Sequence, residues 1–162
     1  MDHPPTKLQM RCPLPAPTAQ VAAGVRPMQR HELDALATLF HTAYLDTVDY
    51  EGESLDEARG VVQAAFDGEF GRFVPEASMV VESGGELLSA SFITVWEGLP
   101  LLAFTVTRPE SKGQGHARRC TAASMQALAA AGHHELRLFV TETNAPARVV
   151  YERLGFVPLL HA

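Results

Sequence analysis

The chain has 162 residues, of which 46% are hydrophobic, and its formal net charge is −6 at pH 7. This length is sufficient for one domain with a sizeable core. The negative charge argues against general affinity for nucleic acids or anionic membranes, and the apolar runs, such as residues 99–106, are too short to span a bilayer.

The first 24 residues differ in composition from the rest of the chain. Residues 1–20 contain five of the eleven prolines and no continuous apolar run of the kind found in a secretory signal. Because proline fixes φ and lacks an N–H group, we expect residues 1–24 to form an extended, disordered arm, with a single folded domain over residues 25–162.

The cysteine and histidine content predicts neither disulfides nor a metal site. Two cysteines, Cys12 and Cys120, are a poor basis for a disulfide framework, which favours a reducing cytoplasmic location. Cysteines and histidines also lack metal-ligand spacing, and the adjacent His133 and His134 would point to different helix faces or lie in a loop. No metal is therefore expected.

Two helices are predicted in the first half of the domain. Apolar residues recur at helical spacing in the segment 31–46, which leaves His31 and His41 on a solvated face. An acidic loop follows, and Ser54 is then a suitable N-cap with Glu57 as its capping-box partner. The apolar face of this second helix is formed by Val61, Val62, Ala65 and Phe66.

After Pro75 the sequence changes to short stretches with the composition of strands, at residues 78–82, 86–96 and 100–107. Turn residues separate these stretches at Gly84-Gly85 and around Gly98, which predicts an antiparallel meander. A helix closed by Gly132, a strand over 135–140, a helix from Asn144 to Gly155 and a short last strand follow. This order predicts an α/β (α+β) fold with a mixed, mostly antiparallel sheet flanked by helices.

The stretch RPESKGQGHARR, residues 108–119, combines two glycines with four basic side chains. It connects the strand ending near Thr107 to the helix starting near Gly115, where first-turn amides and the helix dipole favour an anion. The spacing matches neither GxGxxG nor a Walker A motif. On spacing alone, a phosphate site and a solvated turn with a basic helix start are equal alternatives.

A second motif lies in the segment 136–156, where Tyr151 follows Asn144 by seven residues. Taken together, the two segments resemble the GCN5-related N-acetyltransferase (GNAT) superfamily. Its first motif, Arg/Gln-x-x-Gly-x-Gly/Ala, reads Lys112-Gly113-Gln114-Gly115-His116-Ala117 here. Its second, Asn-x-x-Ala-x-x-x-Tyr-x-x-x-Gly-Phe, matches at Asn144, Ala147, Tyr151, Gly155 and Phe156. The resemblance is strong over residues 101–158 and extends at the level of element order from Val25 to Trp96.

The resemblance implies a GNAT-like sheet with a splayed strand pair that holds acetyl-CoA as co-substrate. Backbone amides from Gln114 to Arg118 would hold the pyrophosphate, and the strand backbone at Val106 and Thr107 would pair with the pantetheine arm. The N–H near Val106 would polarise the thioester carbonyl. The full cofactor-binding set implied is Val106, Thr107, Lys112, Gly113, Gln114, Gly115, His116, Ala117, Arg118, Asn144 and Tyr151.

Tyr151 is the catalytic residue that the resemblance implies, as the proton donor to the departing thiolate. A phenol of pKa about 10 is protonated at neutral pH and can serve this role. The structural alternative is a core aromatic on an amphipathic helix, and Asn144 has a competing role as a helix cap.

Two features depart from the family pattern. Lys112 replaces the usual Arg or Gln, which keeps a cation near the phosphates but loses planar bidentate geometry. Many relatives also continue beyond the position of Ala162 into a further strand that walls the acceptor pocket. Either a partner subunit completes this wall in a homodimer, or the pocket is open.

The acceptor is expected at the acidic loop between the first two helices, since this loop lines the acceptor site in the resembled family. Tyr44, Asp49 and Glu51 are the acceptor-binding candidates, because carboxylates attract a cationic amine. A merely solvated acidic loop is an equal alternative. No general base is assigned, although Glu97 and Glu142 stand at strand ends.

The resulting hypothesis is an N-acetyltransferase that transfers acetyl from acetyl-CoA to a primary amine of a small molecule or protein. Direct attack in a ternary complex is expected, because Cys120 lies inside a helix and is not suited to form an acyl-enzyme. The alternatives are a catalytically inactive CoA-binding regulatory module and a structural domain whose glycine turn binds nothing.

Overall fold

The computed structural model describes residues 6–15, 23–45 and 50–159. The helices are α1 (Leu33–Tyr44), α2 (Leu55–Phe66), α3 (His116–Ala130) and α4 (Ala145–Leu154). The strands are β1 (Lys7–Pro13), β2 (Val25–Pro27), β3 (Arg72–Phe73), β4 (Met79–Ser83), β5 (Glu86–Trp96), β6 (Leu99–Thr107), β7 (Glu135–Thr141) and β8 (Val157–Pro158).

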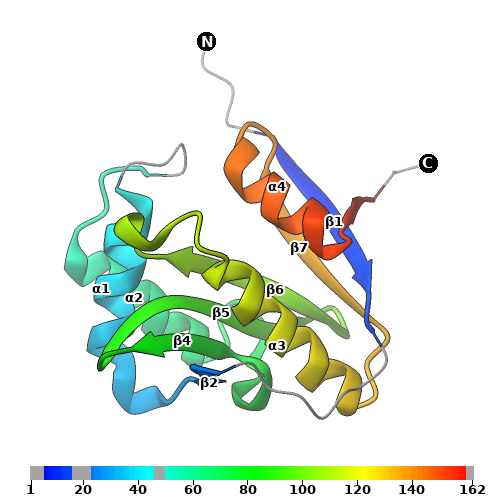
Figure 1. Ribbon diagram of the computed structural model, residues 1–162, viewed down its shortest axis with the longest axis horizontal. Helices are drawn as coiled ribbons and strands as arrows, with labels where there is room; N and C mark the ends of the chain where they lie inside the picture. Colours follow the sequence, from blue (N-terminus) through cyan, green and yellow to red (C-terminus); the bar gives the residue numbers. More distant parts are fainter. Residues whose placement is uncertain (1–5, 16–22, 46–49, 160–162) are drawn as a thin grey trace.

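The strands form one sheet in the order β2-β4-β5-β6-β7-β1-β8, with β3 paired to β5. All neighbours are antiparallel except β6 and β7, which run parallel. Helices α1 and α2 cover one face of the sheet, and α3 and α4 cover the other (Figure 1). A hydrophobic core lies between the sheet and each pair of helices. The predicted mixed, mostly antiparallel sheet flanked by helices is confirmed.

Local capping signals explain where the helices begin and end. Ser54 Oγ accepts a hydrogen bond from the amide of Glu57 at 3.1 Å, which completes the predicted capping box of α2. Asn144 Oδ1 accepts from the amide of Ala147 at 3.3 Å at the start of α4. Gly155, with φ of 103°, ends α4 in the left-handed conformation that glycine tolerates.

The expected disordered arm over residues 1–24 is wrong for residues 7–13, which form β1. This strand pairs with β7 along its whole length and with β8 on its other side. Met10 is fully buried and Cys12 is nearly so, and both pack in the core under α3 and α4. The prediction of disorder rested on the proline content of this segment. Pro13, however, is the last residue of the strand, where its missing N–H and fixed φ are tolerated.

An extra strand thus comes from the N-terminal side of the chain. β8 pairs only with β1 among the described strands, so β1 also fixes the residues that follow α4. Gly155, at the end of α4, lies close to Cys12, since a Cβ at that glycine would be 3.4 Å from Sγ. The N-terminal strand therefore supports the helix that carries Tyr151.

Met10→Ala tests the docking of β1 directly. Truncating a fully buried methionine removes apolar contacts and leaves a cavity, so we expect the free energy of unfolding to fall by about 2–5 kcal/mol. Arg11→Ala, on the exposed face of the same strand, is the control and should change it by less than about 0.5 kcal/mol. Urea denaturation measures both, and equal small losses would show that β1 is not part of the core.

Candidate functional site

The two parallel strands β6 and β7 separate toward their carboxyl ends. Their register consists of the pairs Leu101↔Arg137 and Leu102↔Leu138. β6 continues to Thr107 and β7 to Thr141, but within the described chain no further residues of these two strands pair with each other. A gap in the hydrogen-bond ladder therefore opens in the middle of the sheet, as the predicted splay requires.

The register also determines which backbone groups of β6 point into this gap. The amide of Arg108 donates to Leu88 O at 2.9 Å, and Val106 stands opposite Ala90. Hydrogen-bonded pairs alternate along an antiparallel ladder, so Val106 directs its amide and carbonyl to β5. The backbone groups of Thr105 and Thr107 consequently point toward β7, into the gap.

This alternation differs from the sequence-based expectation for Val106. The motif resemblance assigned the thioester-polarising amide and pantetheine pairing to Val106 and Thr107, but the amide of Val106 is directed to β5. The geometry instead offers Thr105 together with Thr107. A single sequence does not show which residues of β6 direct their backbone groups toward β7, because this depends on the side of β6 on which each neighbouring strand lies.

A β-bulge lies where the gap begins. Phe92 pairs with Phe104, whereas the next residue, Ile93, pairs with Leu102, so Ala103 is the extra residue on β6. A bulge leaves its extra residue outside the regular ladder and bends the strand. The backbone of β6 is therefore irregular at the point where a ligand in the gap would reach furthest into the sheet.

The glycine turn lies at the open end of the same gap. Gly113 and Gly115 both have positive φ, 79° and 83°, and Gly115 is the N-cap of α3. A Cβ built at either glycine would meet no heavy atom within 4 Å, so the space above the turn is open. The amide of Arg119 donates to Gly115 O, so the amides of His116, Ala117 and Arg118 precede the helical ladder. These amides and the helix dipole can hold an anion.

The basic side chains around this turn have separate roles. Lys112 Nζ donates to Ala43 O, at the end of α1, with a distance of 3.4 Å, which differs from its expected position at the phosphates. His116 Nε2 lies 3.2 Å from Gln114 Oε1, so these two side chains contact each other. Arg119 contacts His116 Nδ1 and donates to Ala23 O, which ties α3 to the residues before β2.

The residues of the second motif lie just beyond the open end of β7. Asn144 caps α4, as described above, so its expected competing role as a cap is present. Tyr151 is half-buried against the core under α3 and α4, with its ring centroid 5.9 Å from that of Phe156. Tyr151 therefore packs as a core aromatic does while part of its side chain is accessible.

Neither cysteine is suited to form an acyl-enzyme. Cys120 is fully buried, and burial raises the pKa of its thiol to about 12, so the thiolate that a nucleophile requires is disfavoured at neutral pH. Burial likewise raises the pKa of Cys12, whose Sγ lies 3.6 Å from Leu154 O.

The described acceptor candidates lie around the carboxyl end of α1. The ring of Tyr44 is 4.8 Å from that of Phe40, which in turn is 5.1 Å from Phe104 on β6. Tyr44 thus belongs to an aromatic cluster that reaches the splayed part of β6. Glu51 is exposed, and its amide donates to Glu53 Oε2 at 3.0 Å. Asp49 lies outside the described residues.

His41 was expected on a solvated face and is instead half-buried. Its Nε2 lies 3.1 Å from the carbonyl oxygen of Glu53, in the segment leading to α2. Since a carbonyl only accepts, Nε2 carries the proton in this contact. His41 therefore joins the end of α1 to the loop that precedes α2, a contact that helical periodicity alone does not predict.

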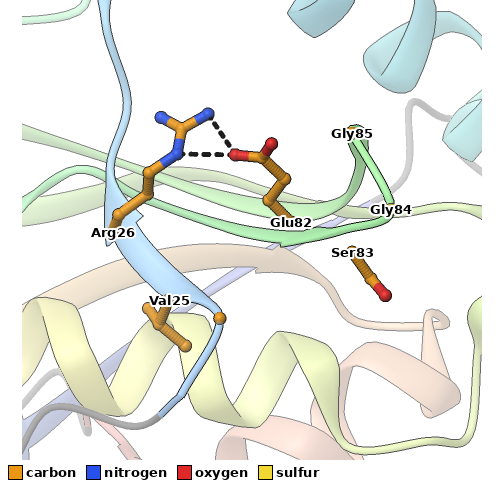
Figure 2. A pocket seen from close by; sticks show the side chains of 7 residues that line it. Val25, Arg26, Glu82, Ser83, Gly84 and Gly85 are labelled. Carbon is orange, nitrogen blue, oxygen red and sulfur yellow. Dashed lines mark hydrogen bonds and ion pairs between the residues drawn. The ribbon is translucent and has the colours of Figure 1, made fainter.

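A separate hollow of about 410 Å³ lies at β2 and the β4–β5 turn, and none of the motif residues lines it. Figure 2 shows Arg26 beside Glu82 in this hollow. Arg26 forms an ion pair with Glu82 at 2.7 Å and another with Glu32. These contacts raise the pKa of Arg26, and the hydrogen bond from Arg26 lowers the pKa of Glu32. Because its charges already compensate one another, this hollow is a poor anion site.

Metal-binding clusters and membrane-spanning helices are both absent from the described residues. No group of three or more His, Cys, Asp or Glu residues there is arranged to hold a metal ion. None of the described helices combines the length and apolar character needed to cross a bilayer.

The sequence is similar to one described protein family and to a curated acetyltransferase. Residues 98–161 match the family described as FR47-like protein. A mycothiol acetyltransferase of Streptomyces bingchenggensis is 36% identical over 86 residues, which are 52% of this chain and 28% of that protein. The chain thus spans only a part of the length of this curated relative.

Solved structures share the fold at low sequence identity. A GNAT-family protein of Novosphingobium aromaticivorans has a TM-score of 0.67 and 21% identity, over 94% of this chain and 59% of that one. The PaiA N-acetyltransferase of Thermoplasma acidophilum, solved with coenzyme A, has a TM-score of 0.65 and 13% identity, over 81% and 87%. The chain therefore has the fold of the GCN5-related N-acetyltransferases, and its residues 98–161 match the FR47-like family.

Proposed function

We propose that this chain is an acetyl-CoA-dependent N-acetyltransferase that acts on a primary amine of a small molecule or protein. The observation that carries the proposal is the continuity of the open side of β6 with the glycine turn. Backbone groups of Thr105 and Thr107 point into the gap, and the gap leads to the amides at the start of α3. Such a path suits a long ligand with an amide-rich arm and an anionic end.

In this proposal the pantetheine arm of acetyl-CoA pairs with β6 as an added strand. Peptide-like amides of the arm exchange hydrogen bonds with Thr105 and Thr107, which β7 leaves open. The pyrophosphate lies at the glycine turn, on the amides from Gln114 to Arg118, where the start of α3 stabilises negative charge. The thioester then lies toward the bulge at Ala103, with Asn144 at the open end of β7.

The chemical step is a direct attack in a ternary complex. The neutral amine attacks the carbonyl carbon of the thioester, and a tetrahedral intermediate with a negative oxygen forms. An amide of the irregular β6 backbone near Ala103 can stabilise this oxygen. The C–S bond then breaks, the sulfur takes a proton from the Tyr151 hydroxyl, and the amine proton passes to water, from which the Tyr151 phenolate regains a proton. No covalent enzyme intermediate is needed, in agreement with the burial of both cysteines.

The names of two relatives support this proposal. One is an acetyltransferase, and the other is an N-acetyltransferase solved with coenzyme A. The open backbone of β6 and the glycine turn support the proposed position of the cofactor on this chain. Tyr44 and Glu51 remain the described acceptor candidates, since Tyr44 belongs to the aromatic cluster that reaches Phe104 on the splayed strand.

An acetylation assay on a panel of primary amines, with product detection by mass, tests the proposal. We expect the mass of one acetyl group on at least one amine, together with stoichiometric release of free CoA thiol. Binding of acetyl-CoA without transfer to any amine would instead favour the inactive CoA-binding module. Absence of acetyl-CoA binding, measured by calorimetry, would contradict both functions.

A further inference from the structure

The first residue of the glycine motif, Lys112, makes a contact that cofactor binding does not account for. Its Nζ donates to the carbonyl oxygen of Ala43, 69 positions earlier in the chain. Ala43 lies in the last turn of α1, where carbonyl groups have no partner within the helix. An ammonium group at the carboxyl end of a helix also interacts favourably with the helix dipole.

The same turn of α1 contacts the other parts of the site. Phe40 packs on Phe104, in the splayed part of β6, and Tyr44 packs on Phe40. His41 lies 3.1 Å from the carbonyl oxygen of Glu53, just before α2. The last turn of α1 therefore joins the cofactor strand and the segment leading to α2, and Lys112 adds the glycine turn to this set.

We propose that Lys112 is a positioning residue that ties the glycine turn to the end of α1, and so helps to hold the acceptor side of the site in place. This inference rests on the proposed function for the identity of the two sites, but the tether itself is a property of the ligand-free chain. The pyrophosphate is then held by backbone amides from Gln114 to Arg118, and Lys112 acts on the acceptor through α1.

The contact between Lys112 and α1 should affect the reaction because Lys112 stands next to the glycine turn. Gly113 follows it directly, so the glycine turn and the anchored side chain share one short segment. Any displacement of the end of α1 moves Phe40 relative to Phe104, beside the expected thioester. Removing the tether should therefore weaken acceptor binding while the cofactor amides stay in place.

Hydrogen–deuterium exchange on the ligand-free chain of 162 residues tests the tether without any assumption about activity. In Lys112→Met we expect amides in the last turn of α1 and in residues 50–54 to exchange about two- to fivefold faster than in the wild type. Lys112→Arg keeps a cationic donor and should restore the wild-type rates. Arg153→Met removes an exposed cation from α4 and should leave these rates unchanged.

Steady-state kinetics then separate the tether from direct phosphate binding. For Lys112→Met we expect the KM for the acceptor amine to rise about two- to fivefold, while the Kd for acetyl-CoA stays within about twofold. Unchanged exchange rates in Lys112→Met, or a loss of acetyl-CoA affinity of tenfold or more with a weaker salt dependence, would overturn the inference. Because exchange is measured without ligand, it still tests the tether if the chain proves unable to transfer acetyl groups.

Discussion

Replacing Tyr151 by Phe should lower kcat for amine acetylation by about 10²–10⁴-fold, the range that a positioned general acid contributes. The substitution removes one hydroxyl group and keeps the ring, which packs beside Phe156. The Kd for acetyl-CoA and the free energy of unfolding should therefore change little. The loss falls on kcat because without the phenol the sulfur leaves as an unprotonated thiolate.

The control for this prediction is Ser83→Ala, which removes an exposed hydroxyl group at the end of β4. We expect its kcat to stay within about twofold of the wild type, since single surface substitutions rarely have larger effects. A leaving thiol of lower pKa needs less help from an acid, so an acyl donor with such a thiol should narrow the difference between wild type and Tyr151→Phe. If Tyr151→Phe and Ser83→Ala retained equal kcat, Tyr151 would be a packing residue only.

Replacing Gly115 by Ala should weaken acetyl-CoA binding by about 10- to 100-fold. Gly115 has φ of 83° and stands at the N-cap of α3, so a Cβ enters the open space that we propose for the phosphate oxygens. A phosphate displaced by this Cβ loses charge-assisted hydrogen bonds to the backbone, each of which contributes about 1.5–3 kcal/mol. Isothermal titration calorimetry with acetyl-CoA measures the change.

Gly98→Ala is a matched control for the backbone strain of this change. Gly98 has φ of 81°, and a Cβ there also meets nothing within 4 Å. In both variants an alanine must adopt the left-handed conformation, which lowers stability by roughly 1–2 kcal/mol. Gly98, however, lies in the turn between β5 and β6 and not at the gap between β6 and β7. Equal acetyl-CoA affinity in the two variants would remove the glycine turn from the cofactor site.

Local signals in the sequence predicted much of this molecule. The capping box at Ser54 and Glu57 and the cap and stop of α4 at Asn144 and Gly155 appear as expected. These features depend on residues three or four positions apart, so their physical causes lie within one short segment. The glycine turn between β6 and α3 is predicted for the same reason.

The long-range features were not predictable from one sequence. β1 docks beside β7 through pairs such as Met10↔Leu138, which are far apart in the chain, and prolines near the strand suggested disorder. The backbone groups of Thr105, and not those of Val106, face the gap because of the register between β5 and β6. The contact of Lys112 with Ala43 depends on where α1 ends in space. Each is fixed by tertiary packing rather than by local pattern.

Acetyl-CoA is proposed to occupy the gap between β6 and β7 and the turn at the start of α3. Hydrogen–deuterium exchange with and without acetyl-CoA measures this most directly. We expect slower exchange in residues 103–118 and 139–144, with no change at Gly24–Arg26 and residues 82–85, which line the separate hollow. Protection at that hollow, with unchanged exchange along β6 and the glycine turn, would contradict the claim.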